Sequence, residues 1–188
     1  RDMLHHAYNM KEAKIILKSG LVKIDGKTRV DDGFPVGLMD VVVVGEEVYR
    51  ILPEHNGLTL KKIDKKESNF KLLRIENKVY IKKGKMQLNF HDGKNIVIDR
   101  NDYKTGDVLV FDFVDRKVKS FLKFEKGCKA LIIKGNNIGF VVTVEDIIIT
   151  KSSMQNQVVV DVGERKFTLP KSYLFVVGKD EPVIKIGE

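Results

Sequence analysis

Six basic residues near the start of the sequence have a spacing that suits contact with phosphate groups. A helix would carry three of them as one stripe, because they lie three and four residues apart. An alternating segment directly afterwards carries the other three. The six residues are Lys11, Lys14, Lys18, Lys23, Lys27 and Arg29. A cationic helix stripe beside a basic β-ribbon suits the phosphates of a nucleic acid. For one such run taken alone, a solvated surface is the more common explanation.

Positive charge elsewhere in the chain strengthens the nucleic-acid interpretation. The 188 residues include 34 Lys and Arg against 26 Asp and Glu, a net charge of +8, and the isoelectric point is near 9.4. Residues 61–85 contain ten basic and three acidic residues, and residues 116–134 contain seven basic residues and one acidic residue. The latter cluster adds three candidate contacts, which are Lys123, Lys126 and Lys134. Three basic clusters and a high isoelectric point favour a polyanionic partner.

Residue types that could perform catalysis or hold a metal do not occur in a suitable pattern. A helix would point the adjacent His5 and His6 in different directions, so they could not share one ion. No HExxH, CxxC or phosphate-binding GxxxxGK motif is present. Flanking lysines could lower the pKa of the lone Cys128, but a buried or incidental thiol is the better interpretation. We predict no catalytic residue, no metal, no cofactor and no small-molecule substrate.

The same composition bears on location and partners. The apolar runs are far shorter than the ~18 residues that a membrane-spanning helix needs, so we expect no membrane association. A single cysteine cannot form an internal disulfide, which favours a reducing compartment.

The basic stripe must be positioned by a helix with clear end signals. Asn9 and Glu12 have the spacing of a capping box, and Gly20 stands where a C-terminal glycine would end the helix. Ala13, Ile16 and Leu17 give this segment one apolar face. We interpret residues 4–8 as the end of a preceding helix. Asp25-Gly26, between two alternating runs, predicts a two-residue hairpin turn. Helix, helix and hairpin would form a small module over residues 1–45.

The remainder of the chain reads as β-structure. Many short strands at about 8–12-residue spacing are typical of small barrels or sandwiches. We expect a β-rich central domain over residues 46–118 and a further barrel with C-terminal strands over 119–188. The fold class is therefore α+β, mostly β, with no helix longer than three turns after residue 60. The predicted strands are 41–44, 48–52, 58–63, 70–75, 79–82, 86–90, 96–99, 108–113, 120–124, 130–133, 139–144, 158–162, 166–169 and 174–177.

Several long strings resemble one family. Residues 20–29 (GLVKIDGKTR) followed by 34–41 (FPVGLMDV) closely resemble the S4e family of archaeal and eukaryotic small-subunit ribosomal proteins. Residues 84–95 (GKMQLNFHDGKN) are similar to the central domain of that family. Residues 124–127 with 135–139 are similar to its KOW segment, and 173–178 (YLFVVG) to its tail. The likeness covers essentially the whole chain in the right order.

This resemblance implies a fold and a role. It implies an RNA-binding module of the ribosomal S-four type, a β-rich central domain and an SH3-like KOW barrel. It also implies a structural role in the cytoplasmic ribosome, without catalysis, in which the partners are small-subunit rRNA and neighbouring ribosomal proteins. Off the ribosome we expect a monomer. In that module the helix–hairpin face meets RNA, and it maps onto the six basic residues of 11–29.

The sequence departs from the family pattern at two places. Asn136, Phe140 and Val142 stand where the KOW segment has two arginines and a glycine, which leaves this loop less suited to RNA contact than the first module. The family also carries a basic N-terminal extension that would precede Arg1, and we expect it to strengthen rRNA binding. The alternative function is a free RNA-binding regulator or an RNA-modifying factor with the same module. Because the three modules use all 188 residues, no catalytic domain remains for the latter.

Overall fold

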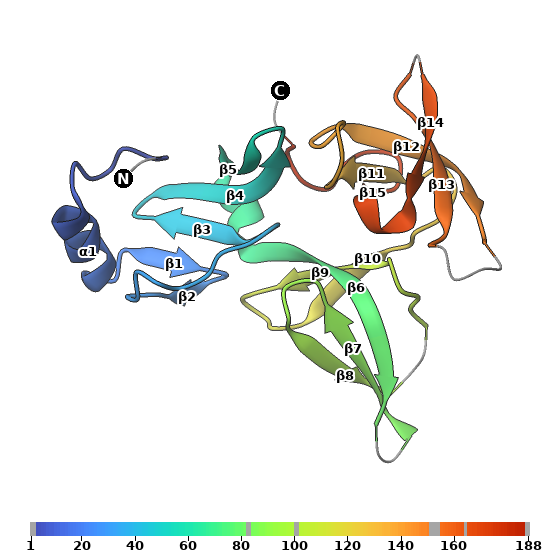
Figure 1. Cartoon of the computed structure of the whole chain (residues 1–188). Coiled ribbons are helices and arrows are strands. Elements are labelled where there is room, and N and C mark those ends of the chain that lie inside the picture. Colours follow the sequence, from blue (N-terminus) through green and yellow to red (C-terminus); the bar gives the residue numbers. More distant parts are fainter. Residues whose placement is uncertain (1–2, 82–83, 100–101, 151–154, 164, 187–188) are drawn as a thin grey trace.

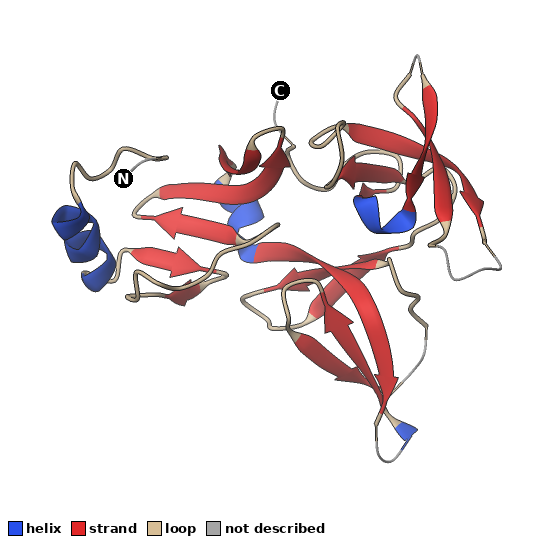
Figure 2. Ribbon diagram, in the orientation of Figure 1, coloured by secondary structure: helices blue, strands red, loops and turns tan. Residues whose placement is uncertain are grey.

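Three five-stranded antiparallel sheets account for most of the molecule (Figure 1). The computed structural model describes residues 3–81, 84–99, 102–150, 155–163 and 165–186. The sheets follow one another along the chain, and Figure 1 shows them as a blue to teal, a green to yellow and an orange to red unit. Helical structure is sparse, as Figure 2 shows. The prediction of a mostly-β protein with few helices is confirmed.

The first sheet has the strand order β2-β1-β3-β4-β5 and carries the helix α1 (Met10–Lys18) at one end. Its strands are β1 (Val22–Ile24), β2 (Lys27–Thr28), β3 (Val41–Val44), β4 (Glu47–Glu54) and β5 (Gly57–Lys62). The predicted Asp25-Gly26 turn joins β1 to β2. Both turn residues have positive φ, 50° and 73°, as a type I′ hairpin turn requires.

The second sheet has the order β10-β9-β6-β7-β8. A short 3-10 helix, η1 (Lys65–Asn69), leads into it from β5. Its strands are β6 (Phe70–Tyr80), β7 (Met86–Phe90), β8 (Asn95–Ile98), β9 (Val108–Asp112) and β10 (Val118–Leu122). β6 pairs with β9 through its first half and with β7 through its second half, so it bends across the middle of the unit.

The third sheet has the order β14-β13-β12-β11-β15. Its strands are β11 (Lys129–Ile132), β12 (Val141–Ile148), β13 (Gln157–Asp161), β14 (Lys166–Pro170) and β15 (Leu174–Gly178). The 3-10 turn η3 (Lys171–Tyr173) precedes β15, which returns the chain to pair with β11.

The largest hydrophobic core joins the three units. It is built mainly from the inward residues of the third sheet, but Met39 and Leu52 of the first unit and Leu72 and Val108 of the second belong to the same cluster. Burial of apolar surface is the main stabilising term in folding. The shared cluster therefore holds the three sheets together.

Some sequence-based expectations change in the structure. Residues 4–8 were expected to end a helix; that prediction is wrong, because they form turns and bends and His5 has a φ of 55°. The segments 70–75 and 79–82 are parts of the single strand β6, which ends at Tyr80, and Lys82 lies outside the described residues. The predicted boundary after residue 45 falls between β3 and β4, which are paired neighbours in the first sheet. The boundary after 118 falls inside β10.

Candidate nucleic-acid interface

Local signals in the sequence fix the helix that carries the basic stripe. Asn9 caps α1: its side-chain oxygen accepts a hydrogen bond from the Glu12 backbone N–H at 3.0 Å. The Glu12 carboxylate reaches back to the backbone N–H of Tyr8 at 2.8 Å, so donors at the helix start are satisfied from both directions. Gly20, with a φ of 76°, follows the helix end. The predicted cap of Asn9 on Glu12 is confirmed, and the reciprocal bond of the box goes to Tyr8, one residue before the N-cap.

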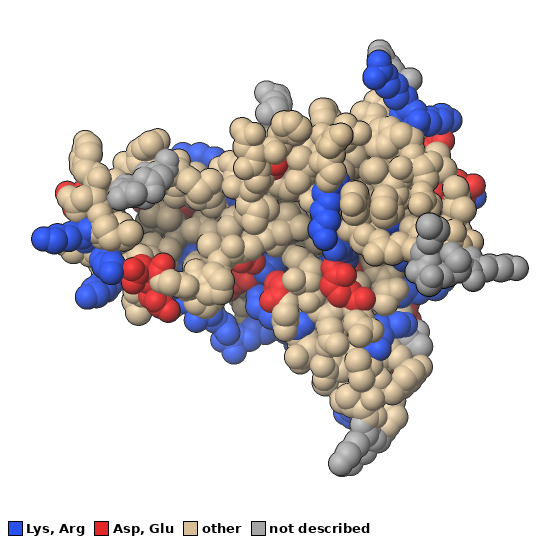
Figure 3. All heavy atoms as spheres, in the orientation of Figure 1, with Lys and Arg blue, Asp and Glu red and all other residues tan. Residues whose placement is uncertain are grey.

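The apolar face of α1 determines where its lysines point. Ala13, Ile16 and Leu17 line an apolar cavity that Val22 and Leu60 of the first sheet also line. Because this face turns toward the sheet, the lysines project from the opposite side into solvent. The exposed lysines are Lys11, Lys14 and Lys18. Figure 3 shows Lys and Arg spheres gathered over α1 and below the β1–β2 hairpin.

One lysine of this stripe has an acidic partner. The ammonium group of Lys14 lies 3.1 Å from a carboxylate oxygen of Asp32, and this contact lowers the pKa of the Asp32 carboxyl. For Lys11 and Lys18 there is no ion pair within the described part of the chain. These two lysines are therefore the most available to an external phosphate.

The β1–β2 hairpin divides its basic residues between two faces. Lys23 alternates with the buried Val22 and Ile24 and so projects away from the core. Lys27 pairs in register with Ile24, which puts it on the face that carries Ile24. Arg29 is half-buried, and its guanidinium carbon lies 4.1 Å from the centre of the Phe34 ring. Lys27 and Arg29 thus face a cavity between the first two sheets, whereas Lys23 lies with the exposed surface.

The three candidates from residues 116–134 lie far along the chain from α1: Lys123 directly follows β10 of the second sheet, and Lys126 and Lys134 flank β11 of the third. Lys123 lies 5.6 Å from the Phe121 ring centre, and Lys126 is 2.7 Å from the carboxylate of Asp146. Lys134 is exposed in the turn after β11. The nine candidate residues therefore form two separate groups, one on the helix–hairpin end and one between β10 and the turn after β11.

One lysine of the basic cluster 61–85 is buried and occupied inside the protein. Lys71 is 1% exposed, and its ammonium group contacts three carboxylates. It lies 3.0 Å from Asp25 and 2.8 Å from Asp92, and it also donates to Asp40. Asp25 and Asp40 come from the first unit and Asp92 from the β7–β8 turn of the second. Lys71 therefore fixes the hairpin turn to the second sheet.

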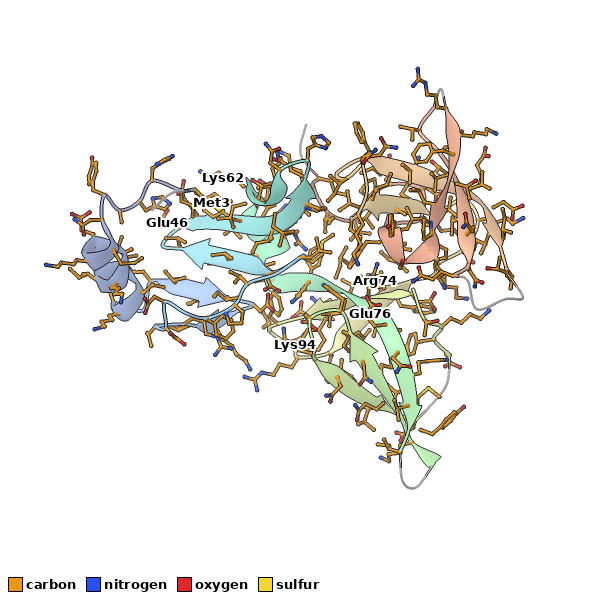
Figure 4. All side chains as sticks on the ribbon, in the orientation of Figure 1. Met3, Glu46, Lys62, Arg74, Glu76 and Lys94 are labelled. Atoms are coloured by element: carbon orange, nitrogen blue, oxygen red, sulfur yellow. The ribbon has the colours of Figure 1, made fainter. Side chains whose placement is uncertain are left out.

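Lys94 completes this cluster at the surface. Its ammonium group is 2.7 Å from Asp25 and 3.1 Å from Asp92, and Figure 4 shows it between the first and second units. Burial alone would raise the pKa of Asp92, but the hydrogen bond and charge of Lys71 outweigh it and hold the pKa at about 2. The pKa of Asp25 is lowered in the same way. For Lys71 burial acts to lower the pKa, yet the three carboxylates raise it well above its usual value. Asp25, Lys71 and Asp92 are therefore charged at neutral pH.

A second polar cluster joins the second sheet to the third. Arg74 donates to the backbone oxygens of Ser172 and Leu174, at 3.2 and 2.9 Å. Its guanidinium also donates to Glu76 at 2.8 Å, and Figure 4 shows both residues on the side of β6 toward the third sheet. Arg74 is thus a structural contact rather than a free cation, and like Lys71 it leaves the basic cluster of 61–85 with fewer exposed charges.

His91 meets all three units. The backbone N–H of Arg74 donates to His91 Nδ1 at 3.2 Å, so Nε2 carries the proton and donates to the Leu38 oxygen at 3.1 Å. Its ring packs edge-on against Phe175, with 5.2 Å between centres. Burial lowers the pKa of His91, so the ring is neutral at physiological pH. Only the tertiary fold brings these partners together, and no local sequence signal marks them.

The chemistry of the remaining candidate groups is limited. Among the described residues, no cluster of three or more His, Cys, Asp or Glu side chains is placed to hold a metal ion. Cys128 is buried, and burial raises the pKa of its thiol, which disfavours the reactive thiolate. None of the helices in the described ranges is long and apolar enough to cross a membrane.

Comparisons with known proteins agree with this architecture. Residues 45–118 match the model of the ribosomal family S4e. Small ribosomal subunit protein eS4 of Methanosphaera stadtmanae is 44% identical over 99% of this chain and 78% of its own length. The protein of the same name from Methanothermobacter thermautotrophicus is 42% identical over the same shares.

A solved structure shows the same fold. The crystal structure of the 30S ribosomal protein S4e from Thermoplasma acidophilum superposes with a TM-score of 0.81 at 34% identity, covering 90% of this chain and 86% of the other. Members of this family are structural ribosomal proteins and not enzymes. At 44% identity over nearly its full length, with the three-sheet fold in common, this chain belongs to the S4e family of small-subunit ribosomal proteins.

Proposed function

We propose that this protein is a structural component of the small ribosomal subunit that binds rRNA through its helix–hairpin end. The exposed lysines of α1 carry the proposal, because Lys11 and Lys18 lie on one side of the helix and form no ion pair within the described ranges. Such a stripe contacts phosphates and sets the position of the protein on RNA without reading sequence. Lys23 extends it along the hairpin, and the lysines of the third sheet offer a second contact region.

We further propose that each sheet corresponds to one functional module. The first would be the S-four-type RNA-binding module, the second the β-rich central domain and the third the SH3-like KOW barrel. Strand pairing supports boundaries near residues 63 and 123 in place of 45 and 118. The protein would act in the cytoplasmic ribosome, contact neighbouring ribosomal proteins, and be a monomer when free.

Cosedimentation tests the ribosomal role. We expect the purified chain to cosediment with small ribosomal subunits that lack their own copy, and to bind protein-free small-subunit rRNA at physiological salt. Binding to RNA without incorporation into subunits would favour the free RNA-binding regulator. Failure to bind either would overturn the proposal.

A further inference from the structure

We infer that the cavity between the first and second units receives one unpaired nucleotide of RNA. This inference rests on the proposed rRNA-binding function and names the chemistry of one contact. The cavity has a volume of about 380 Å³, within the ~300–1,000 Å³ of small-ligand sites. Its floor includes Lys71 and its carboxylate partners, and its walls come from the 24–40 segment and from the second sheet.

The walls combine aromatic rings with an arginine. Phe34, Phe111 and Phe113 line the cavity together with Arg29. The Arg29 guanidinium stacks on Phe34, and its Nε is buried with no hydrogen-bond partner among the described residues. Burying a donor without a partner costs about 1–3 kcal/mol. A ligand with ring faces and carbonyl oxygens, such as a nucleobase, suits aromatic and guanidinium surfaces of this kind.

The rim is cationic. Lys27, Lys94 and Arg116 line the cavity and are exposed to solvent. The carboxylates of Asp25, Asp40 and Asp92 also line it, but Lys71 and Lys94 hold them in ion pairs. Because five cationic side chains face three carboxylates, the site retains positive charge for a phosphate group. An uncharged apolar ligand would leave this charge unused.

The position of the cavity fits an RNA contact. Lys27 and Arg29 lie on the opposite face of the hairpin from Lys23, and β2 is the edge strand of its sheet. An RNA strand that follows the α1 stripe would reach the rim by passing around this edge. The backbone at Arg116 has a φ of 51°, a conformation that is costly for a side chain of this kind. That geometry is fixed by the turn between β9 and β10, which holds the cation at the rim.

The test combines three variants with two RNA probes. Phe34→Leu keeps an uncharged apolar side chain but removes the ring. Arg29→Lys keeps the charge but removes the planar fork, and Arg116→Asn removes a rim cation with a residue that tolerates positive φ. Arg165→Asn is the matched control, because Arg165 is an exposed arginine on the third unit. The probes are protein-free small-subunit rRNA and a short single-stranded RNA that contains one fluorescent 2-aminopurine.

We expect each cavity variant to weaken binding of both probes about fivefold or more, from the ~1–3 kcal/mol of one base stacking contact. Phe34→Leu should weaken binding without changing the dependence of affinity on salt. It should also expose one unpaired rRNA base to chemical modification, while the rest of the footprint stays the same. The wild-type protein should quench the 2-aminopurine signal. Arg165→Asn should change affinity less than twofold.

Two results would overturn the inference that the cavity receives a nucleotide. One is full rRNA binding with an unchanged footprint in both Phe34→Leu and Arg29→Lys; the other is a 2-aminopurine signal that the wild-type protein does not quench. In the first case the proposed rRNA-binding function stands. A third outcome is possible: the wild-type protein quenches the fluorescence of the short RNA and Phe34→Leu does not, but small-subunit rRNA is not bound. In that case the nucleotide site stands and the ribosomal role fails. A free mononucleotide that binds as tightly as the short RNA would overturn the assignment to RNA.

Discussion

Lys71 is fully buried in β6, where the residues before and after it, Phe70 and Leu72, are apolar. Three carboxylates surround its ammonium group. Removing one partner of a buried ion pair is costly because the other charges remain desolvated. We predict that Lys71→Met lowers the free energy of unfolding by about 3–5 kcal/mol, measured by urea denaturation. Lys61→Met is the matched control: Lys61 pairs with Glu54 at the surface, and its loss should cost within about 1 kcal/mol. Equal stability of the two variants would contradict the structural role of Lys71.

The same cluster makes stability depend on pH. Asp92 has a pKa of about 2 when folded against an ordinary value of 3.8, so the unfolded state takes up the proton first as pH falls. The wild-type protein should therefore lose about 2 kcal/mol between pH 4 and pH 2 from this group alone. The pKa of His91 is lowered for a different reason, which is burial. Its protonation in the unfolded state adds a loss of stability below about pH 6.5. Denaturation curves at several pH values measure both effects.

Lys71→Met should show the opposite trend above pH 4. Without Lys71 the three carboxylates repel one another, and protonation relieves this repulsion. Acidification from pH 7 should therefore reduce the difference in the free energy of unfolding between the variant and the wild-type protein. A gap that widens steadily from pH 7 to pH 4 would mean that the carboxylates are not clustered in solution.

At the scale of elements, the β1–β2 hairpin is positioned by its turn. Gly26 has a φ of 73°, and a Cβ there would lie 3.1 Å from Phe113 Cβ. Gly45 has a φ of 61° but nothing within 4 Å of the same position. Alanine at either site should cost about 1–2 kcal/mol for the left-handed backbone. We predict that Gly26→Ala costs about 1 kcal/mol more than Gly45→Ala because of the contact with the second sheet. Thermal unfolding of the two variants compares them directly, and equal losses would show that the hairpin does not press on Phe113.

The α1 stripe allows a charge-reversal test. Changing Lys11 and Lys18 to Glu should weaken binding to small-subunit rRNA at least tenfold, with little dependence on RNA sequence, since phosphate contacts carry no base information. Lys179 and Lys185, exposed near the C-terminus, provide a control with the same change in charge. Filter binding at fixed salt measures both. If the two double variants lose affinity equally, net charge and not the stripe governs binding.

How far the sequence predicts these elements depends on how local their causes are. The Asn9 cap of α1 and the Asp25-Gly26 turn are set within a few residues, and both occur as predicted. β6 was predicted as two strands because Glu76 and Asn77 interrupt the apolar pattern; a register shift at this point lets pairing with β7 continue. Residues 4–8 contain helix-forming residues, but the positive φ at His5 breaks the helix.

In the candidate site, too, residues with local sequence signals could be predicted and residues with distant partners could not. The exposed lysines of α1 could be identified from spacing alone. Lys71 and Arg74 could not be separated from surface basic residues by their local sequence. The carboxylate partners of Lys71 lie 21 to 46 residues away, and the backbone oxygens that Arg74 contacts in the third unit lie about 100 residues away. The cavity lined by Arg29, Phe34 and Phe113 is likewise a product of tertiary packing.

At the scale of the whole molecule, two groups of basic residues on different sheets should act together on RNA. Each phosphate contact contributes about −0.9 to the slope of log affinity against log salt on a duplex and about −0.7 on a single strand. With about six contacts we predict a slope of roughly −4 to −6 on small-subunit rRNA. Titrations between low and physiological salt give this number. A slope shallower than about −2 would mean that only one weak surface binds.

The Lys71 cluster also affects the order in which the protein matures during synthesis. Asp25 and Asp40 are made before the lysine that neutralises them, and Asp92 is made after it. At about 5–20 residues per second, the helix–hairpin end waits several seconds for the segment that locks it in place. Domains usually fold in the order in which they emerge. The full set of ion pairs around Lys71 can therefore form only once the β7–β8 turn has been translated.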